Sequence, residues 1–147
     1  MVRSMAVLVA AVSLAVGAVM MSRPAVAAVD PPAPAKERFF EMRTYTAPEG
    51  KLDALHARFR DHTNKLFVKH GIELVGYWTP VDEAKGAKNT LVYILAFPSR
   101  EAREASWKAF GADPEWQKAK AASEVNGKLV EKVESVYLKP TDYSPIK

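Results

Sequence analysis

One segment decides the fold of this chain: Thr90-Leu91-Val92-Tyr93-Ile94-Leu95-Ala96-Phe97, which is apolar at nearly every position. Its β-branched and aromatic residues predict a strand over 90–97. A strand that packs on one face only should alternate apolar and polar side chains, and this strand does not alternate. The segment therefore predicts a strand that is covered on both faces.

Three further strands and two helical regions are predicted around this segment. Alternating or apolar runs bounded by turn residues predict strands over 39–46, 72–79 and 129–138. Between 52 and 70, apolar side chains recur at three- and four-residue steps, which predicts an amphipathic helix that ends at Gly71. A second helical region begins after Ser99, restarts at Asp113-Pro114-Glu115 and runs to about 124.

The order of these elements, β-α-β-β-α-β, predicts an α+β, ferredoxin-like fold with a four-stranded antiparallel sheet and two helices on one face. The helices of one chain cover only one side of the strand over 90–97. A second copy of the sheet is the simplest cover for the other side. We therefore expect a homodimer that associates through the sheet.

The first 28 residues are typical of an export signal. Arg3 precedes the charge-free apolar run 5–21, and Ala25-Val26-Ala27 forms a small-residue cleavage pattern. The signal predicts a protein that is exported to the periplasm or the extracellular space, with a mature N-terminus at Ala28 or Val29. The Ala-rich composition and Pro24 disfavour the alternative, an uncleaved membrane anchor. We expect a Pro-rich linker over 29–38 and the folded domain over 39–147.

The composition excludes several classes of function. The 147 residues contain no Cys, which excludes a disulfide scaffold, a thiolate zinc site and a catalytic thiol. The net charge is +4, and Arg3 and Arg23 would leave with the signal, so the mature chain carries 19 basic and 17 acidic residues, or +2. These charges form no cluster, so we expect no nucleic-acid partner and, after signal cleavage, no stable membrane insertion.

Several motifs resemble the NIPSNAP family in their order and spacing, over about residues 39–136. They are Glu41-Met42-Arg43-Thr44-Tyr45-Thr46, Gly50-Lys51-Leu52, Phe59-Arg60-Asp61-His62-Thr63, His70-Gly71-Ile72, Val75-Gly76-Tyr77-Trp78 and Asp113-Pro114-Glu115-Trp116. The resemblance implies a dimeric α+β barrel. It implies no single reaction, because relatives by fold include cofactor-free monooxygenases, haem-degrading enzymes and small-molecule-binding proteins.

His62 is the candidate catalytic residue. On a regular helical wheel it lies at the edge of the apolar stripe, and His70 lies within that stripe. His62 would then face a pocket as a proton acceptor or ligand contact; the alternative is a half-buried side chain bonded to a backbone carbonyl. His56 and His70 are six and eight residues away, too far along one helix to share a metal ion, so we expect no metal or other cofactor.

The remaining candidate ligand contacts lie on the strands and the second helical region. Alternation places Glu41, Arg43 and Tyr45 on one face of their strand, as an anion contact or as an ion pair at the dimer seam. Aromatic candidates for lining a pocket, with core packing as the alternative, are Tyr77, Trp78, Tyr93, Trp107, Phe110 and Trp116. Arg100, Glu101, Arg103 and Glu104 are interpreted as a solvated helix face.

Two hypotheses about function follow. The first is an exported homodimer that binds a small molecule between sheet and helices. The alternative is a cofactor-independent enzyme, monooxygenase- or isomerase-like, that acts on a small aromatic or carbonyl substrate. An internal pocket that contains His62 would favour the enzyme.

Overall fold

The computed structural model describes residues 37–147. The predicted export signal (1–28) and all but the last two residues of the predicted linker (29–38) lie outside the described residues. The elements follow the predicted order: β1 (Phe39–Thr46), α1 (Leu52–Arg58), η1 (Phe59–Thr63), α2 (Asn64–Lys69), β2 (Glu73–Trp78), η2 (Glu83–Lys85), β3 (Thr90–Phe97), α3 (Arg100–Ala112), α4 (Pro114–Ser123) and β4 (Lys132–Leu138).

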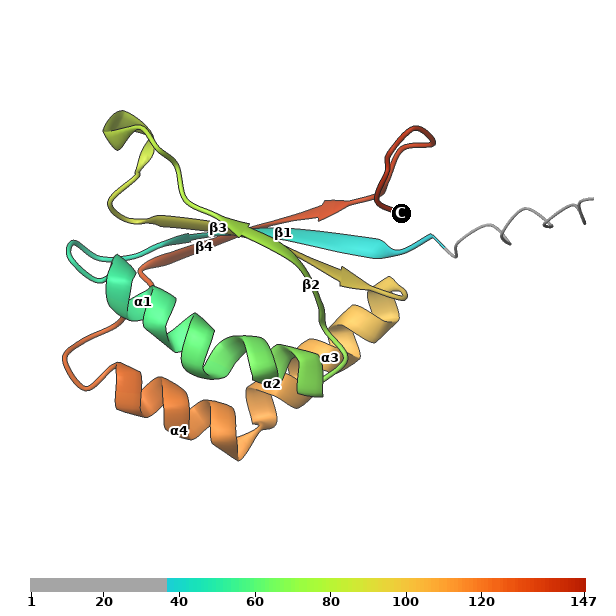
Figure 1. Cartoon of the computed structure of the whole chain (residues 1–147). Coiled ribbons are helices and arrows are strands. Elements are labelled where there is room, and N and C mark those ends of the chain that lie inside the picture. The colour runs from blue at the N-terminus through green and yellow to red at the C-terminus, as the bar shows by residue number, and fades with distance from the viewer. Residues whose placement is uncertain (1–36) are drawn as a thin grey trace, which may run out of the picture. The chain divides into compact units, whose positions relative to one another are not determined.

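The four strands form one antiparallel sheet in the spatial order β2-β3-β1-β4. Helices α1 to α4 all lie on one side of this sheet (Figure 1), which confirms the predicted ferredoxin-like α+β fold. Strands β1 and β3 pair along their whole length, from Phe39 opposite Phe97 to Thr46 opposite Thr90. These two central strands therefore hold their side chains at fixed places beneath the helices.

Side chains alternate along β3 between the helix-covered face and the opposite face of the sheet. Leu91, Tyr93 and Leu95 are at most 1% exposed and belong to the hydrophobic core under the helices. Val92 and Ile94 alternate with them on the opposite face and remain partly exposed. We call this second side the open face, because helices α1 to α4 all lie on the other side of the sheet (Figure 1).

The chain after β4 covers one end of the open face. Pro140 and Ile146 line an apolar hollow of about 320 Å³ together with Phe40 and Ile94, and Phe40 is only 6% exposed. Elsewhere on this face large apolar side chains stay in contact with solvent, among them Trp78 at 51% and Val136 at 47% exposure. The described chain thus covers β3 on one face and only partly on the other.

The predicted helix over 52–70 is interrupted by a wider turn. Helix α1 passes into the π-helical turn η1, in which the N–H of Asn64 bonds to the carbonyl of Phe59 five residues earlier, and α2 then continues. The Thr63 hydroxyl donates to the carbonyl of Arg58 at 3.2 Å. A π turn adds about one residue to a helical turn, so it shifts the face on which every later side chain lies.

Within the described part of the chain, no helix is both long enough and apolar enough to span a membrane.

The predicted caps of the second helical region are confirmed. The Ser99 hydroxyl accepts a hydrogen bond from the N–H of Ala102 at 3.1 Å, and the Asp113 carboxylate accepts one from the N–H of Glu115 at 2.8 Å. The last strand begins at Lys132 rather than at residue 129, because β1 ends at Thr46, directly opposite Lys132. Leu129 is nevertheless buried in the core.

Candidate functional site

A pocket of about 330 Å³ opens between the helices and the covered face of the sheet, beside the edge strand β4. It draws its lining from segments that are far apart in the sequence. We call it the sheet–helix pocket, defined by Tyr45, Arg58, Phe59, Thr63, Phe67, Phe110, Trp116, Lys120, Glu124, Lys128, Val130 and Val133. This volume falls at the lower end of the range for small-molecule sites.

Five of the twelve lining residues are aromatic, and their rings are packed against one another. The ring centroids of Phe110 and Trp116 are 4.5 Å apart, and those of Tyr45 and Phe59 are 6.1 Å apart. Phe67 in turn contacts Phe110 at 4.8 Å between ring centroids. Because these rings belong to or pack on the hydrophobic core, the wall is apolar and held in place before any ligand arrives.

Arg58 brings a buried positive charge to this apolar wall. Its side chain is 4% exposed, and its Nη1 donates to the Glu124 carboxylate at 2.8 Å and to the Ser123 hydroxyl at 3.4 Å. Its guanidinium carbon lies 5.3 Å from the centroid of the Trp116 ring. Its Nε is buried and has no hydrogen-bond partner among residues 37–147. A buried donor without a partner is rare in a folded protein, which marks this group as a candidate ligand contact.

Arg58 was not predicted as a site residue, because on the wheel of a regular helix it lies about 100° away from Phe59. The structure buries both neighbours, and η1 begins directly after Arg58. The adjacent apolar residues Leu66 and Phe67 were the sequence signal that the buried face departs from a regular helix. Both are buried, and a narrow apolar stripe on a regular helix does not accommodate both.

Glu41, Arg43 and Trp107 do come together, in a separate buried cluster beneath α3. Glu41 is fully buried, and Arg103 donates to its two oxygens from Nε and Nη2 at 2.9 and 2.8 Å. The Trp107 indole N–H donates at 2.8 Å and Arg43 at 3.1 Å. The predicted ion-pair alternative is therefore present, but on the helix-covered face rather than at a seam on the open face. Arg103 was wrongly assigned to the solvated helix face.

The charge state of Glu41 follows from these contacts. Burial alone raises the pKa of a carboxyl, but the hydrogen bonds from Arg103 and Trp107 and the charge of Arg43 outweigh it and hold the pKa of Glu41 below its usual value. Glu41 therefore remains ionised at neutral pH. With its acceptors occupied by protein donors, it is a structural anion rather than a free ligand contact.

Tyr45, Tyr77 and Tyr93 surround Phe59 on the covered face, with centroid distances to its ring of 6.1, 5.7 and 5.3 Å. Burial raises the pKa of Tyr77 and of Tyr93 above the ordinary value, so both phenols stay protonated at neutral pH. Of the three, Tyr45 lines the sheet–helix pocket. Tyr93 is fully buried, which agrees with the core-packing interpretation.

The two remaining candidate ligand contacts, His62 and Trp78, lie apart from the Glu41 cluster and from the tyrosines around Phe59. His62 is exposed, so the prediction that it faces the sheet is wrong. The reason is η1: its wider turn rotates His62 away from the apolar stripe while Thr63 is buried instead. Trp78 lies on the open face and, with Tyr77 and His56, lines a second hollow of about 350 Å³.

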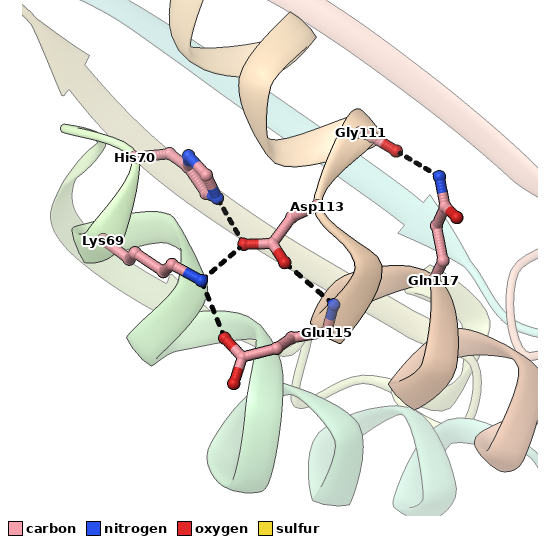
Figure 2. Close-up of polar contacts among 6 residues, drawn as sticks. All are labelled: Lys69, His70, Gly111, Asp113, Glu115 and Gln117. Atoms are coloured by element: carbon pink, nitrogen blue, oxygen red, sulfur yellow. Dashed lines mark hydrogen bonds and ion pairs between the residues drawn. The ribbon is translucent and has the colours of Figure 1, made fainter.

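His70 belongs to a polar cluster that joins the end of α2 to the start of α4 (Figure 2). Its Nε2 lies 2.6 Å from the Asp113 carboxylate, and Lys69 donates to the same carboxylate oxygen at 2.9 Å and to Glu115 at 2.8 Å. Asp113 at the same time caps α4. His70 thus lies at the C-terminus of α2, and this cluster fixes the helices that frame the pocket.

Replacing Asp113 with asparagine is expected to lower stability at neutral pH, because asparagine keeps the helix cap but removes the charge that Lys69 and His70 face. Hydrogen bonds from Lys69 and His70 hold the pKa of Asp113 well below its usual value. A carboxyl whose pKa is lower in the folded protein than in the unfolded chain stabilises the fold above its unfolded pKa of about 3.8. This contribution to stability is lost as the pH falls through the folded-state pKa. Thermal melts between pH 7 and pH 2 should therefore show the difference between wild type and variant shrinking on acidification. A constant difference would contradict this assignment.

Among residues 37–147, no group of three or more His, Asp or Glu side chains is arranged to hold a metal ion.

Comparison with known proteins agrees with the fold. The NIPSNAP family model matches residues 40–145. A crystal structure of a NIPSNAP family protein with unknown function from Agrobacterium tumefaciens is 29% identical, covers 77% of this chain and 96% of its own, and superposes with a TM-score of 0.66. An uncharacterized NIPSNAP-like domain protein from Burkholderia xenovorans is 20% identical, covers 75% of this chain and 90% of its own, and has a TM-score of 0.64. No curated protein matches the chain.

Proposed function

The chain belongs to the NIPSNAP family, and from this premise we propose that it is an exported homodimer that binds a small molecule in the sheet–helix pocket. The observation that carries the proposal is the pocket itself: about 330 Å³, walled by core aromatic rings, with the buried Arg58 at its side. Apolar walls with few polar groups at fixed places are the usual composition of a small-molecule site.

Binding is favoured over catalysis by the residues that the pocket contains. His62 is absent from its lining and exposed, and the fully buried Glu41 is occupied by its own partners. The ionisable side chains of the lining besides Tyr45 are Arg58, Lys120, Lys128 and Glu124, and Glu124 is paired with Arg58. These groups suit the recognition of a ligand better than proton transfer, for which a group that titrates near neutral pH is preferred.

The open face supports the homodimer. On this face β3 presents Val92, Ile94 and Ala96, with Thr90 at one end, and Met42, Ile94 and Val136 lie side by side in the register of β1, β3 and β4. Trp78 extends the apolar surface at 51% exposure. A second copy carries the same apolar surface and matches it by two-fold symmetry, and large exposed apolar patches mark such interfaces.

The N-terminal sequence supports export. Its apolar run 5–21 and the Ala25-Val26-Ala27 pattern are typical of a cleaved signal, after which the mature chain would begin at Ala28 or Val29. An exported binding domain without Cys needs no disulfide chemistry in an oxidising compartment.

Filling the pocket is expected to abolish ligand capture. Val133 lies opposite Tyr45 in the sheet, lines the pocket and is 44% exposed, so Val133→Trp adds an indole at the pocket while leaving the core intact. Wild-type protein is exposed to a metabolite extract, and the retained compounds are identified by mass spectrometry. We expect the compounds held by the wild type to fall at least about tenfold in the Val133→Trp variant, the equivalent of about 1.4 kcal/mol.

His62→Gln is the matched control, because this side chain is exposed and does not line the pocket. It should retain the same compounds in the same amounts and melt within a few degrees of the wild type. Loss of capture in His62→Gln, or full capture in Val133→Trp, would overturn the assignment of the pocket.

A further inference from the structure

We propose that the sheet–helix pocket takes a small aromatic carboxylic acid, with its ring against Phe110 and Trp116 and its carboxylate on Arg58. This inference rests on the proposed function, since it names the chemical class of the ligand for the same pocket. It follows from the charge of the lining, the free donors of Arg58 and the size of the pocket.

The charge of the lining favours an anion. Arg58, Lys120 and Lys128 contribute three positive charges, and Glu124 contributes the one negative charge. Lys120 and Lys128 are exposed, so they attract an acid through solvent rather than bind it closely. Arg58 is the one cation of this set whose side chain is buried, and a buried guanidinium interacts more strongly with an anion than an exposed ammonium does.

The free donors of Arg58 match a carboxylate. Both hydrogen bonds of its guanidinium to described residues leave from Nη1, toward Glu124 and Ser123. The edge formed by Nε and Nη2 makes no hydrogen bond within the described residues, and its Nε is buried. Because protein atoms enclose Nε, Nη2 is the donor of this edge that a ligand carboxylate reaches, through a charge-assisted hydrogen bond.

The size and walls of the pocket limit the rest of the ligand. A volume of about 330 Å³ is roughly twice that of a dry cavity of about 150 Å³ that holds benzene. One aromatic ring with a short acidic chain, or two fused rings, fits this space. Trp116 and Phe110, whose rings are tilted by 34° to each other, both line the pocket and can contact such a ring, and the cation of Arg58 already lies over Trp116 at 5.3 Å.

Glu124 competes with the ligand for Arg58. Its carboxylate holds Nη1 at 2.8 Å and its side chain is 21% exposed, so it neutralises part of the charge that an incoming acid would meet. Removing this negative charge while keeping the shape should therefore strengthen the binding of an acid. A gain in affinity is a useful signature, because a damaged fold does not produce one.

The test is calorimetric titration of the purified protein with matched pairs of one- and two-ring acids and their neutral amides, beginning with 3-phenylpropanoate and 3-phenylpropanamide. We expect acids to bind at least about tenfold more tightly than their amides, the lower range for a charge-assisted hydrogen bond. Arg58→Gln should remove this preference. Glu124→Gln should raise the affinity for the acid several-fold and leave the amide unchanged, while the exposed Lys120→Gln should change the acid affinity less than Arg58→Gln does.

The outcomes separate this inference from the proposed function. Equal binding of acids and amides, with both lost in Val133→Trp, would overturn the carboxylate assignment and leave the pocket as the binding site. Binding of neither class by the wild type would overturn both. If Arg58→Gln does not fold, the Glu124→Gln gain decides alone, and unchanged or weakened acid binding in that variant contradicts the role of Arg58.

Discussion

Replacing Glu41 with alanine is expected to lower the free energy of unfolding by about 3–5 kcal/mol, the usual cost of removing one partner of a buried ion pair. Glu41 is fully buried and accepts hydrogen bonds from Arg103, Trp107 and Arg43. Without it, the guanidinium groups of Arg43 and Arg103, at 15% and 17% side-chain exposure, repel each other beneath α3 with no counter-charge. Urea denaturation at neutral pH measures the loss.

Glu104→Ala is the matched control, because Glu104 is 63% exposed and pairs with Arg100 at 3.7 Å on the surface of α3. It should cost less than about 0.5 kcal/mol. In the double variant Glu41→Ala with Arg103→Met, the loss should be smaller than the sum of the two single losses by at least about 1 kcal/mol, because the stranded charge is removed as well. Additive losses would show that the two side chains do not stabilise each other.

Replacing Ile94 with aspartate is expected to convert the proposed dimer to a monomer and to weaken association at least about 100-fold. Ile94 lies on the open face between Met42 of β1 and Gly76 of β2, and it is partly exposed in one chain. Aspartate is therefore solvated in the monomer, whereas in the proposed dimer an unpaired carboxylate would be buried at a cost of several kcal/mol. Sedimentation at micromolar concentration measures the change.

Val68→Asp is the control for this prediction, because Val68 is 61% exposed on α2, away from the open face. That variant should remain dimeric. A wild-type protein that sediments as a monomer at micromolar concentration, or an Ile94→Asp variant that associates as the wild type does, would contradict an interface on the open face.

The fold was predictable because its signals are local. The apolar run Thr90–Phe97 became β3 with the predicted bounds, and Asp113-Pro114 became the predicted start of α4. Alternation also placed Glu41, Arg43 and Tyr45 correctly on one face. Each of these inferences needs only neighbours a few residues away in the sequence.

The candidate site was less predictable because it depends on distant contacts and on one irregular turn. Arg103 reaches Glu41 across 62 residues of sequence, and no local pattern distinguishes it from the solvated charges around it. The π turn η1 reversed the assignment of His62, which it left exposed, and it directly follows Arg58, which is buried and was not predicted. Of the eight predicted ligand contacts, only Tyr45 lines the sheet–helix pocket. Phe110 and Trp116, two further aromatic candidates, line it as well, whereas Arg58 was not predicted.

The three tryptophans of the chain allow the most direct test of the sheet–helix pocket, because each lies in a different region. Trp116 lines the pocket, Trp107 donates to Glu41, and Trp78 lies on the open face. Fluorine NMR of protein labelled with 5-fluorotryptophan resolves one signal for each, during titration with a small aromatic acid such as 3-phenylpropanoate. The proposed binding of an aromatic acid in the sheet–helix pocket predicts a saturable shift of the Trp116 signal with little change at Trp107 and Trp78. A saturable shift confined to Trp78 or Trp107, or no shift at any of the three signals, would contradict it.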